Sequence, residues 1–143
     1  MLIGEYQYTI DTKKRLALPA KFRRDLGDFI IITRGIDTCL AVYPKKEWAI
    51  ESEKLSRLPE SQSEARRYVR VKMSGAMQVY FDKLGRILIP DYLKKYAGLK
   101  KNVVVCGLTN KLEIWDEQKW ETHIKKAEKE VPTLASKLSG SGV

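Results

Sequence analysis

Two similar stretches decide the fold of this chain: Tyr8-Thr-Ile-Asp-Thr-Lys-Lys-Arg-Leu-Ala-Leu-Pro19 and Val79-Tyr-Phe-Asp-Lys-Leu-Gly-Arg-Ile-Leu-Ile-Pro90. Each contains an aspartate, an arginine and a proline, at positions 11, 15 and 19 in the first and at 82, 86 and 90 in the second. The offset between them is 71 residues in all three cases (82−11, 86−15, 90−19). We interpret the chain as a duplication, because a chance match rarely keeps such residues in the same order.

The similarity resumes after a slip of one residue. Gly35 matches Gly107 and Trp48 matches Trp120, both at an offset of 72 residues (107−35, 120−48). A single unit is too small to bury a comfortable core, so we expect the two units to pack together as an intramolecular pseudo-dimer. The predicted segments are a first unit at 1–48, a helical connector at 49–74, a second unit at 75–120, and a C-terminal helix with a disordered end at 121–143.

Each unit has the pattern of strand, turn, strand, short helix and strand pair, which predicts a mostly β fold with some α structure (α+β). Tyr6, Tyr8 and Ile10 alternate with polar residues, as in a half-buried strand, and Leu16 and Leu18 alternate after the turn. The proline that follows in each unit suits the first turn of a helix. We expect short helices at 21–26 and 92–97, and paired strands at 29–33, 39–43, 103–106 and 111–115.

Longer helices are predicted after each unit. The connector suits one helix that ends near Pro59 and a second that a capping box at Ser61-Gln-Ser-Glu64 opens. The C-terminal segment has an apolar stripe typical of a helix, which Pro132 is expected to end or kink. The final residues, Ser139-Gly-Ser-Gly-Val143, are typical of a disordered end.

Composition limits the class of protein. The chain has 143 residues, 27 Lys+Arg against 18 Asp+Glu, and a formal net charge of +9, which favours an acidic partner, either nucleic acid or an anionic membrane surface. No apolar run approaches the ~20 residues that cross a bilayer, so we expect no membrane association. The start, Met1-Leu2-Ile3-Gly4-Glu5-Tyr6, lacks the pattern of a signal peptide. These features predict a cytoplasmic protein.

The sequence gives little support for a catalytic site or a metal site. The chain has two cysteines, Cys39 and Cys106, and one histidine, His123, which is too few for a structural zinc site in one subunit. We find no phosphate-cradling loop, no nucleophile elbow and no cluster of potential ligands. We therefore expect no enzyme activity and no cofactor. The cysteines are interpreted as small core residues, and the histidine as a solvated or interfacial side chain.

The two Asp-x-x-x-Arg turns are the main candidates for a function. An aspartate at the entry of a turn can accept hydrogen bonds from the backbone N–H groups that follow, so Asp11 and Asp82 are expected to stabilise their turns. Arg15 and Arg86 then emerge at the other end of the turns. Each arginine could pair with an aspartate, or it could project outward. Both hypotheses can hold if the aspartate fixes a rigid turn that presents the arginine.

Outward projection would suit DNA. Arg15 and Arg86, together with Lys13, Lys14 and Lys83, would form a cationic surface whose contacts with phosphates release counterions. A guanidinium can also donate two hydrogen bonds to the O6 and N7 atoms of guanine in the major groove. Two turns are few contacts, so repetition in an oligomer on repeated DNA sites would supply the affinity.

At this point the sequence resembles the MraZ family, bacterial regulators within the SpoVT/AbrB-like swapped-hairpin superfamily. The resemblance rests on the two Asp-x-x-x-Arg turns, each leading to a proline, and on Gly-Leu-Thr-Asn-Lys-Leu-Glu-Ile-Trp at 107–115. It implies a pseudo-dimeric barrel of swapped hairpins that assembles into rings. It also implies a nucleoid-associated regulator, usually a repressor, that binds short direct repeats of double-stranded DNA in the promoter of its own division and cell-wall gene cluster.

One position departs from that family pattern. Lys14 stands where a glycine usually precedes the arginine, and a non-glycine residue disfavours positive φ. We therefore expect the first turn to differ in shape from the second. Basic residues elsewhere are interpreted as solvated faces, with phosphate contacts as the alternative for Arg23, Arg24, Lys94 and Lys95 and with intersubunit salt bridges as the alternative for Arg66, Arg67, Arg70 and Lys72.

A second hypothesis for function is a ring-forming scaffold, or an antitoxin-like partner that holds another protein without reading DNA bases. Antitoxins of the resembled superfamily usually carry one unit and a disordered tail that wraps the toxin. This chain has two units and only a short Ser/Gly end, which counts against the antitoxin version.

Overall fold

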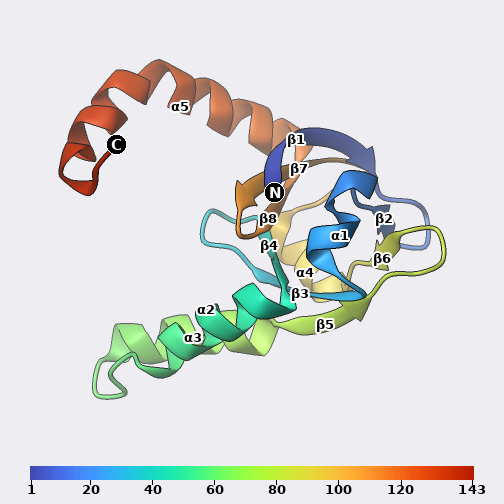
Figure 1. The fold of residues 1–143 in the computed structure, drawn as a ribbon, viewed down its shortest axis with the longest axis horizontal. Helices are drawn as coiled ribbons and strands as arrows, with labels where there is room; N and C mark the ends of the chain where they lie inside the picture. Colours follow the sequence, from blue (N-terminus) through green and yellow to red (C-terminus); the bar gives the residue numbers. More distant parts are fainter.

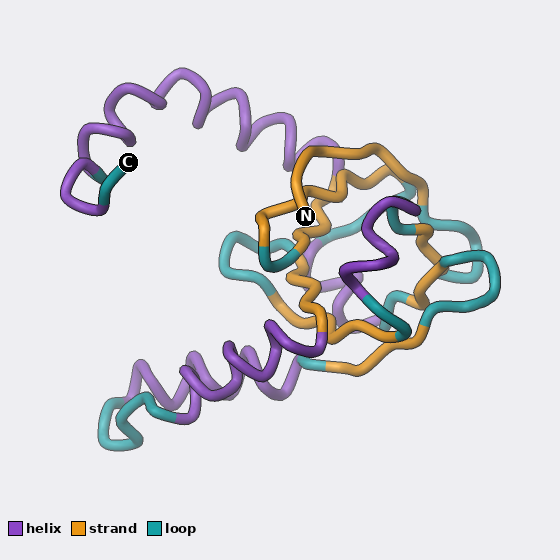
Figure 2. The backbone as a smooth tube through the Cα atoms, viewed as in Figure 1, coloured by secondary structure: helices purple, strands orange, loops and turns teal.

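The computed structural model describes residues 1–143, and it shows an α+β body from which two helical arms extend (Figures 1 and 2). One arm consists of residues 45–75 and the other of residues 117–141. The strands are β1 (Leu2–Thr9), β2 (Arg15–Ala17), β3 (Phe29–Arg34), β4 (Leu40–Pro44), β5 (Met77–Tyr80), β6 (Arg86–Leu88), β7 (Asn102–Thr109) and β8 (Leu112–Asp116). The helices are η1 (Ala20–Phe22), α1 (Arg23–Leu26), α2 (Lys45–Ser56), α3 (Ser63–Gly75), α4 (Asp91–Ala97), α5 (Glu117–Lys137) and η2 (Ser139–Ser141).

The strands of the two copies interleave. Six of them form a sheet in the order β1-β7-β8-β4-β3-β5, and β2 pairs with β6 in a separate two-stranded sheet. The first strand of each copy therefore pairs with the other copy, β1 with β7 and β5 with β3, and all these pairs are antiparallel. This exchange confirms the interleaved pseudo-dimer that the duplication predicts.

The register of the strands follows the internal repeat. Leu16 lies opposite Ile87, its equivalent at the offset of 71 (87−16). Ala41 lies opposite Glu113, its equivalent at the offset of 72 (113−41). Each of these strand pairs therefore brings equivalent residues of the two copies together, as a pseudo-twofold axis through both pairs requires.

Two expectations about the architecture are wrong. Helical residues outnumber strand residues, at 44% against 29%, because α2, α3 and α5, which lie mainly outside the repeated units, are long. The larger sheet is not closed into a barrel, since β1 and β5 remain as its edges and the β2–β6 pair stays separate. The α+β class itself is confirmed.

One main core joins the two copies. Twenty buried residues pack together, drawn from both units, and they include Leu16, Phe22, Ile87 and Leu93 with almost no exposed surface. Tyr6 and Tyr8 pack against this core while remaining partly exposed, as their alternation with polar residues predicts. The core positions the turns, because Leu16 and Ile87 directly follow Arg15 and Arg86 in β2 and β6.

A smaller core lies beneath the start of α5. It contains Cys39, Val104, Cys106, Trp115 and Trp120, and both cysteines are free thiols. Their burial confirms the interpretation of the cysteines as core residues. The two tryptophans pack edge to face, with ring centres 5.6 Å apart.

The helical arms differ from expectation at their ends. α3 begins at Ser63 with Gln62 as the N-cap, and no side chain caps it, so the predicted capping box at Ser61 and Glu64 does not form. Of the two outcomes expected at Pro132, the helix does not end there: α5 continues to Lys137, and Figure 1 shows its far end turning aside, in agreement with a kink. After α5, the residues Ser139–Ser141 form the short helix η2.

Candidate nucleic-acid interface

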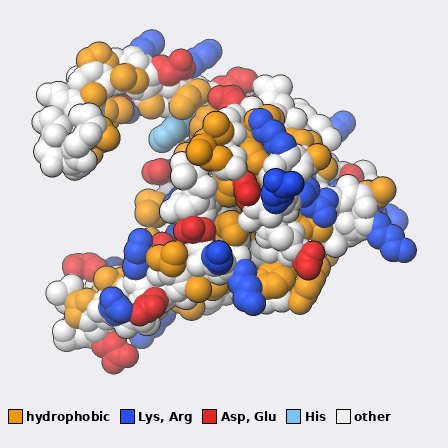
Figure 3. All heavy atoms as spheres, in the orientation of Figure 1, with side chains coloured by type: hydrophobic (Ala, Val, Ile, Leu, Met, Phe, Trp, Pro, Cys, Tyr) orange, Lys and Arg blue, Asp and Glu red, His pale blue; other side chains and the backbone are white.

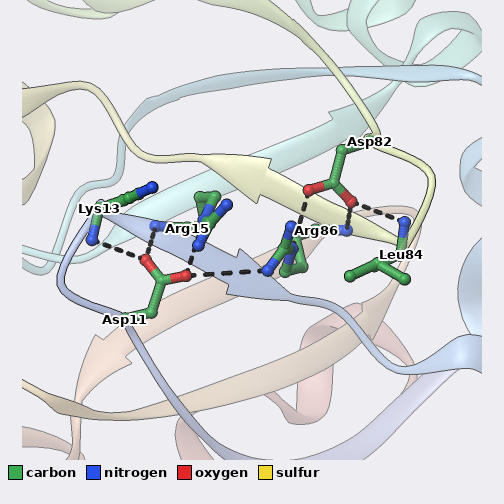
Figure 4. Close-up of polar contacts among 6 residues, drawn as sticks. All are labelled: Asp11, Lys13, Arg15, Asp82, Leu84 and Arg86. Atoms are coloured by element: carbon green, nitrogen blue, oxygen red, sulfur yellow. Dashed lines mark hydrogen bonds and ion pairs between the residues drawn. The ribbon is translucent and has the colours of Figure 1, made fainter.

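Each aspartate fixes its turn through the same set of hydrogen bonds (Figure 4). Oδ1 of Asp11 accepts hydrogen bonds from the backbone N–H groups of Lys13 and Arg15, each at 2.9 Å, and its Oδ2 accepts one from Arg15 Nε at 2.7 Å. Asp82 accepts the equivalent bonds from the N–H groups of Leu84 and Arg86, each at 2.9 Å, and from Arg86 Nε at 2.8 Å. Side chain and backbone are therefore locked together in both turns.

These hydrogen bonds stabilise the ionised carboxylates. The backbone N–H of Arg15 is the main factor that lowers the pKa of Asp11. Desolvation is the second factor and raises the pKa, and the Arg15 side chain and the backbone N–H of Lys13 lower it further. The backbone N–H of Arg86 lowers the pKa of Asp82 in the same way. Both aspartates are therefore anionic at neutral pH, as the pairing with arginine requires.

The first turn does not differ in shape from the second, contrary to expectation. Lys14 adopts a φ of 63° and Gly85 a φ of 76°. The N–H of Lys14 donates to the carbonyl of Asp11 at 3.0 Å, and the N–H of Gly85 donates to the carbonyl of Asp82 at the same distance. The hydrogen bonds of Asp11 hold Lys14 in a backbone region that a non-glycine residue disfavours.

What supports each turn differs between the copies. The ammonium group of Lys14 lies 2.5 Å from a carboxylate oxygen of Asp91, at the start of α4. Gly85 is buried instead, and a Cβ atom there would meet the Nη1 atom of Arg23 in α1. The Arg23 guanidinium stacks over the Phe81 ring at 4.2 Å, and its Nε is buried without a hydrogen-bond partner. Each turn is therefore supported by a residue of the other copy, the first by Asp91 and the second by Arg23.

Sequence reasoning did not anticipate this role of Arg23. It treated the residue only as part of a solvated face or as a phosphate contact. Gly85 could have indicated this role, because the equivalent position of the first turn holds Lys14. A glycine in only one of two equivalent turns indicates that another group packs closely against it. Arg24, the next residue, is exposed, as expected for a solvated face.

Both arginines are partly exposed. The side chain of Arg15 is 33% exposed and that of Arg86 is 26% exposed. Each uses Nε to bind its aspartate, and neither Nη1 nor Nη2 of either residue donates a hydrogen bond within the chain. The Nη1 atom of Arg86 also lies 3.9 Å from Oδ2 of Asp11. The terminal nitrogens are therefore available for a ligand.

The turns lie side by side at one end of the body, opposite the helical arms (Figure 1). The β2–β6 pairing brings them together, since Arg15 lies opposite Leu88 and Arg86 opposite Ala17. Lys13 and Lys83 are exposed, and so is Leu84 at the tip of the second turn. Figure 3 shows Lys and Arg side chains at this end of the molecule.

Other conspicuous residues lie away from the turns. Lys72 is only 3% exposed, so the expected basic face of α3 is wrong at this position, whereas Arg66, Arg67 and Arg70 are exposed. His123 is exposed on α5 with its ring 4.8 Å from that of Trp115, which agrees with a solvated side chain. No group of three or more His, Cys, Asp or Glu side chains is placed to hold a metal ion.

The fold and the turns define a class of protein: a tandem, interleaved α+β domain that presents two aspartate-locked arginine turns at one tip. A family model described as "MraZ protein, putative antitoxin-like" matches the chain twice, at residues 1–71 and 73–138. The chain belongs to this family. The two matches adjoin within α3, in agreement with the internal repeat.

Full-length relatives support the same assignment. The chain is 43% identical to a protein of Clostridium tetani over 143 residues, which cover 100% of both chains. It is 45% identical to a protein of Desulforamulus reducens over 138 residues, or 96% of this chain and 97% of the relative. A protein of Natranaerobius thermophilus is 42% identical over 138 residues, 96% of both chains. All three relatives are named transcriptional regulator MraZ.

None of the helices combines the length and the apolar character that crossing a bilayer requires.

Proposed function

We propose that this protein is a DNA-binding transcriptional regulator that reads double-stranded DNA through the turns at 11–15 and 82–86. The supporting observation is the pair of aspartate-locked arginines at one tip of a basic protein, whose terminal nitrogens donate no hydrogen bond within the chain. The names of the relatives support the class of function. Arg15 and Arg86 read bases, and the exposed lysines nearby contact phosphates.

The geometry of the arginines suits readout in the major groove. Binding of Nε to an aspartate orients the plane of the guanidinium and leaves the two terminal nitrogens as a pair of donors. Guanine offers O6 and N7 as a matching pair of acceptors, and a good bidentate contact contributes about 1–3 kcal/mol of discrimination. Because the aspartate already restricts the side chain, less conformational entropy is lost on binding.

The affinity for DNA comes from several protomers that each contact one copy of a repeated site. One protomer presents its two turns as one composite tip, so it contacts one short site, and an oligomer on short direct repeats multiplies the contacts. α5 extends from the body and exposes Val131 and Leu134, and Leu138 directly after it is also exposed, so a second copy could cover these side chains. We propose a ring-shaped homo-oligomer that binds repeats in its own promoter, represses its division and cell-wall gene cluster, and resides on the nucleoid in the cytoplasm.

The test is binding to the upstream region of its own gene, measured by fluorescence anisotropy over a series of salt concentrations. The double variant Arg15→Ala, Arg86→Ala is expected to lose sequence preference and to weaken specific binding by about tenfold or more. The matched control is Arg57→Ala. Arg57 also pairs with an acidic residue four positions away, Glu53, but it lies at the end of α2 in a helical arm.

The lysines provide a separate readout. Lys13→Ala with Lys83→Ala is expected to weaken all DNA sequences alike and to reduce the slope of log affinity against log salt by about 0.9 for each phosphate that is no longer neutralised. Unchanged affinity and salt slope in both double variants would overturn the mechanism based on the turns. The scaffold or antitoxin-like hypothesis would then gain support if light scattering showed an oligomer whose mass does not change on addition of promoter DNA.

A further inference from the structure

A cavity of about 280 Å³ lies where α3 meets the end of β3 and the helix α4, and none of the residues that line it belongs to the DNA-binding turns. Its lining includes three cationic side chains, two tyrosines and no acidic residue. A concave site with this charge favours an anion. The residues that matter to the argument are Arg34, Arg67, Tyr68, Val71, Lys72 and Tyr96.

Lys72 is the unusual member of this lining. The residue is only 3% exposed, and its ammonium group makes no hydrogen bond and no ion pair within the chain. The ammonium group nevertheless keeps contact with solvent, because Arg23 Nε is the one side-chain nitrogen that is both fully buried and without a hydrogen-bond partner. The ring of Tyr43 lies near it, with its centre 5.5 Å from Nζ. The Tyr43 ring stabilises the cation, and an accessible ammonium group that no carboxylate binds still attracts an anion.

The charges around Lys72 leave it only partly compensated. Burial lowers the pKa of Lys72, and the nearby Lys111 lowers it further. Glu51 and Glu113 act in the opposite direction, but neither carboxylate lies within ion-pair distance. An anion in the cavity would therefore restore the balance at Lys72 itself.

Contacts within the chain already hold Arg34, another residue of the cavity lining, in a fixed position. Nη1 of Arg34 donates hydrogen bonds to the carbonyl of Val71 at 2.9 Å and to Oγ of Ser74 at 3.3 Å. Its guanidinium lies over the rings of Tyr92 and Tyr96, at 5.7 and 5.8 Å. These contacts hold Arg34 in place while its other nitrogens make no hydrogen bond within the chain. A preorganised guanidinium costs little to use in binding.

We propose that this cavity binds a small anion of the phosphate or carboxylate class, held between the ammonium group of Lys72 and the guanidinium groups of Arg34 and Arg67. The ligand would join three elements, because Lys72 and Arg67 belong to α3, Arg34 to β3, and Tyr96 of the cavity wall to α4. Binding would stiffen the joint between the helical arm and the body.

The experiment uses the full-length protein with two probes, inorganic phosphate and succinate, each titrated at constant ionic strength against sodium chloride. Isothermal calorimetry and the melting temperature are the readouts. We expect saturable binding of at least one probe with a rise in melting temperature. Removal of one charged hydrogen-bond donor should weaken binding by about tenfold or more in Lys72→Met and in Arg67→Gln.

Arg70→Gln is the matched control, since Arg70 is an exposed arginine of α3 that does not line the cavity. It should bind the anion as the unmodified protein does. Arg67→Gln changes an exposed residue and keeps the test valid if Lys72→Met fails to fold. No saturable binding of either probe, or equal weakening in Arg70→Gln, would overturn the proposal. Failure to bind because a side chain of a second copy fills the cavity in the oligomer would overturn it too.

Discussion

Oδ2 of Asp11 lies 3.9 Å from Nη1 of Arg86, so the acid of the first turn reaches the arginine of the second (Figure 4). The same oxygen accepts the hydrogen bond from Arg15 Nε at 2.7 Å. No reciprocal ion pair joins Arg15 to Asp82. The two turns are alike in backbone, but the first aspartate contacts both arginines and the second contacts only one.

This asymmetry predicts unequal effects of removing the two acids. Asp11→Asn should reduce the ratio of specific to non-specific DNA affinity more than Asp82→Asn. It frees Arg15 from its only carboxylate and also removes the second carboxylate near Arg86, whereas Asp82→Asn leaves Arg86 beside Asp11. Each freed side chain should lower that ratio by roughly two- to tenfold, from the conformational entropy then lost on binding. Non-specific affinity should rise slightly in both variants, since each removes one negative charge. Competition binding with specific and random duplexes gives the ratio.

Equal losses of specificity in the two asparagine variants would contradict this interpretation. The control is Glu53→Asn, which breaks the ion pair of Glu53 with Arg57 in a helical arm and leaves the turns intact. It should leave the specificity ratio unchanged.

Substitution of Lys14 and of Gly85, the residues before the two arginines, should change the free energy of unfolding by different amounts. In Lys14→Gly, relief of about 1–2 kcal/mol of left-handed strain is offset by the greater entropy of the unfolded chain and by removal of the exposed pair with Asp91. The free energy of unfolding should therefore change by less than about 1 kcal/mol. Gly85→Ala should lower it by about 1–2 kcal/mol, because alanine disfavours this φ and its Cβ displaces Arg23.

Urea denaturation of the two variants measures this difference. If Lys14→Gly proved as destabilising as Gly85→Ala, the ion pair of Lys14 with Asp91 would matter more than the backbone strain. The same measurement on Asp91→Asn, which removes the ion pair without changing residue 14, would show that directly.

Acid should weaken the turns. The pKa values of Asp11 and Asp82 are lowered in the folded protein from an ordinary value of 3.8, chiefly by backbone N–H groups. The stability that the two carboxylates contribute is therefore fully present above that ordinary value and is lost as pH falls through the lowered values. The difference in unfolding free energy between the unmodified protein and the double variant Asp11→Asn, Asp82→Asn should be constant near neutral pH.

That difference should shrink as the pH falls below about 4, towards the folded-state pKa values. Chemical denaturation at a series of pH values tests it. A difference that grew on acidification would mean that the carboxylates are not the ionised, hydrogen-bonded groups of the turns.

The thiols should be unreactive in the folded protein. Burial, with a smaller contribution from the charge of Glu113, raises the pKa of Cys39 to about 12 and that of Cys106 to about 11. Relative to an ordinary value of 9.0, the thiolate fraction near pH 8 falls by about a thousandfold and a hundredfold, respectively. Labelling with a thiol reagent at pH 8 should therefore be slow, and it should become fast in denaturant. Rapid labelling of either cysteine without denaturant would show that the small core opens.

Much of the fold could be predicted from the chain, because duplication and hydrophobic period are local properties of the sequence. The repeat at offsets of 71 and 72 predicted the pseudo-dimer, and the short helices after Pro19 and Pro90 lie where those prolines indicated. The ends of the arms could not be predicted in this way. The capping box at Ser61 did not form, since local propensity decides a helix end only where nothing else competes.

Lys14 illustrates the limit for the site. Its backbone preference predicted a different turn, but the hydrogen bonds of Asp11 outweigh that preference. Lys72 illustrates the same limit for charge, because a lysine on a helix was expected in solvent and is instead buried, with its ammonium group 5.5 Å from the centre of the Tyr43 ring. In both cases a contact made elsewhere in the structure overrides the preference of a single residue.

The sequence by itself determined that the chain is duplicated, that it is basic, and that each copy carries an aspartate four residues before an arginine, since composition and spacing need no third dimension. Only the tertiary structure decided which strands pair across the copies, that Asp11 contacts both arginines, and that Arg23 packs against Gly85. The physical reason is that these contacts join residues far apart in the chain, and burial of a shared core, rather than local preference, selects them.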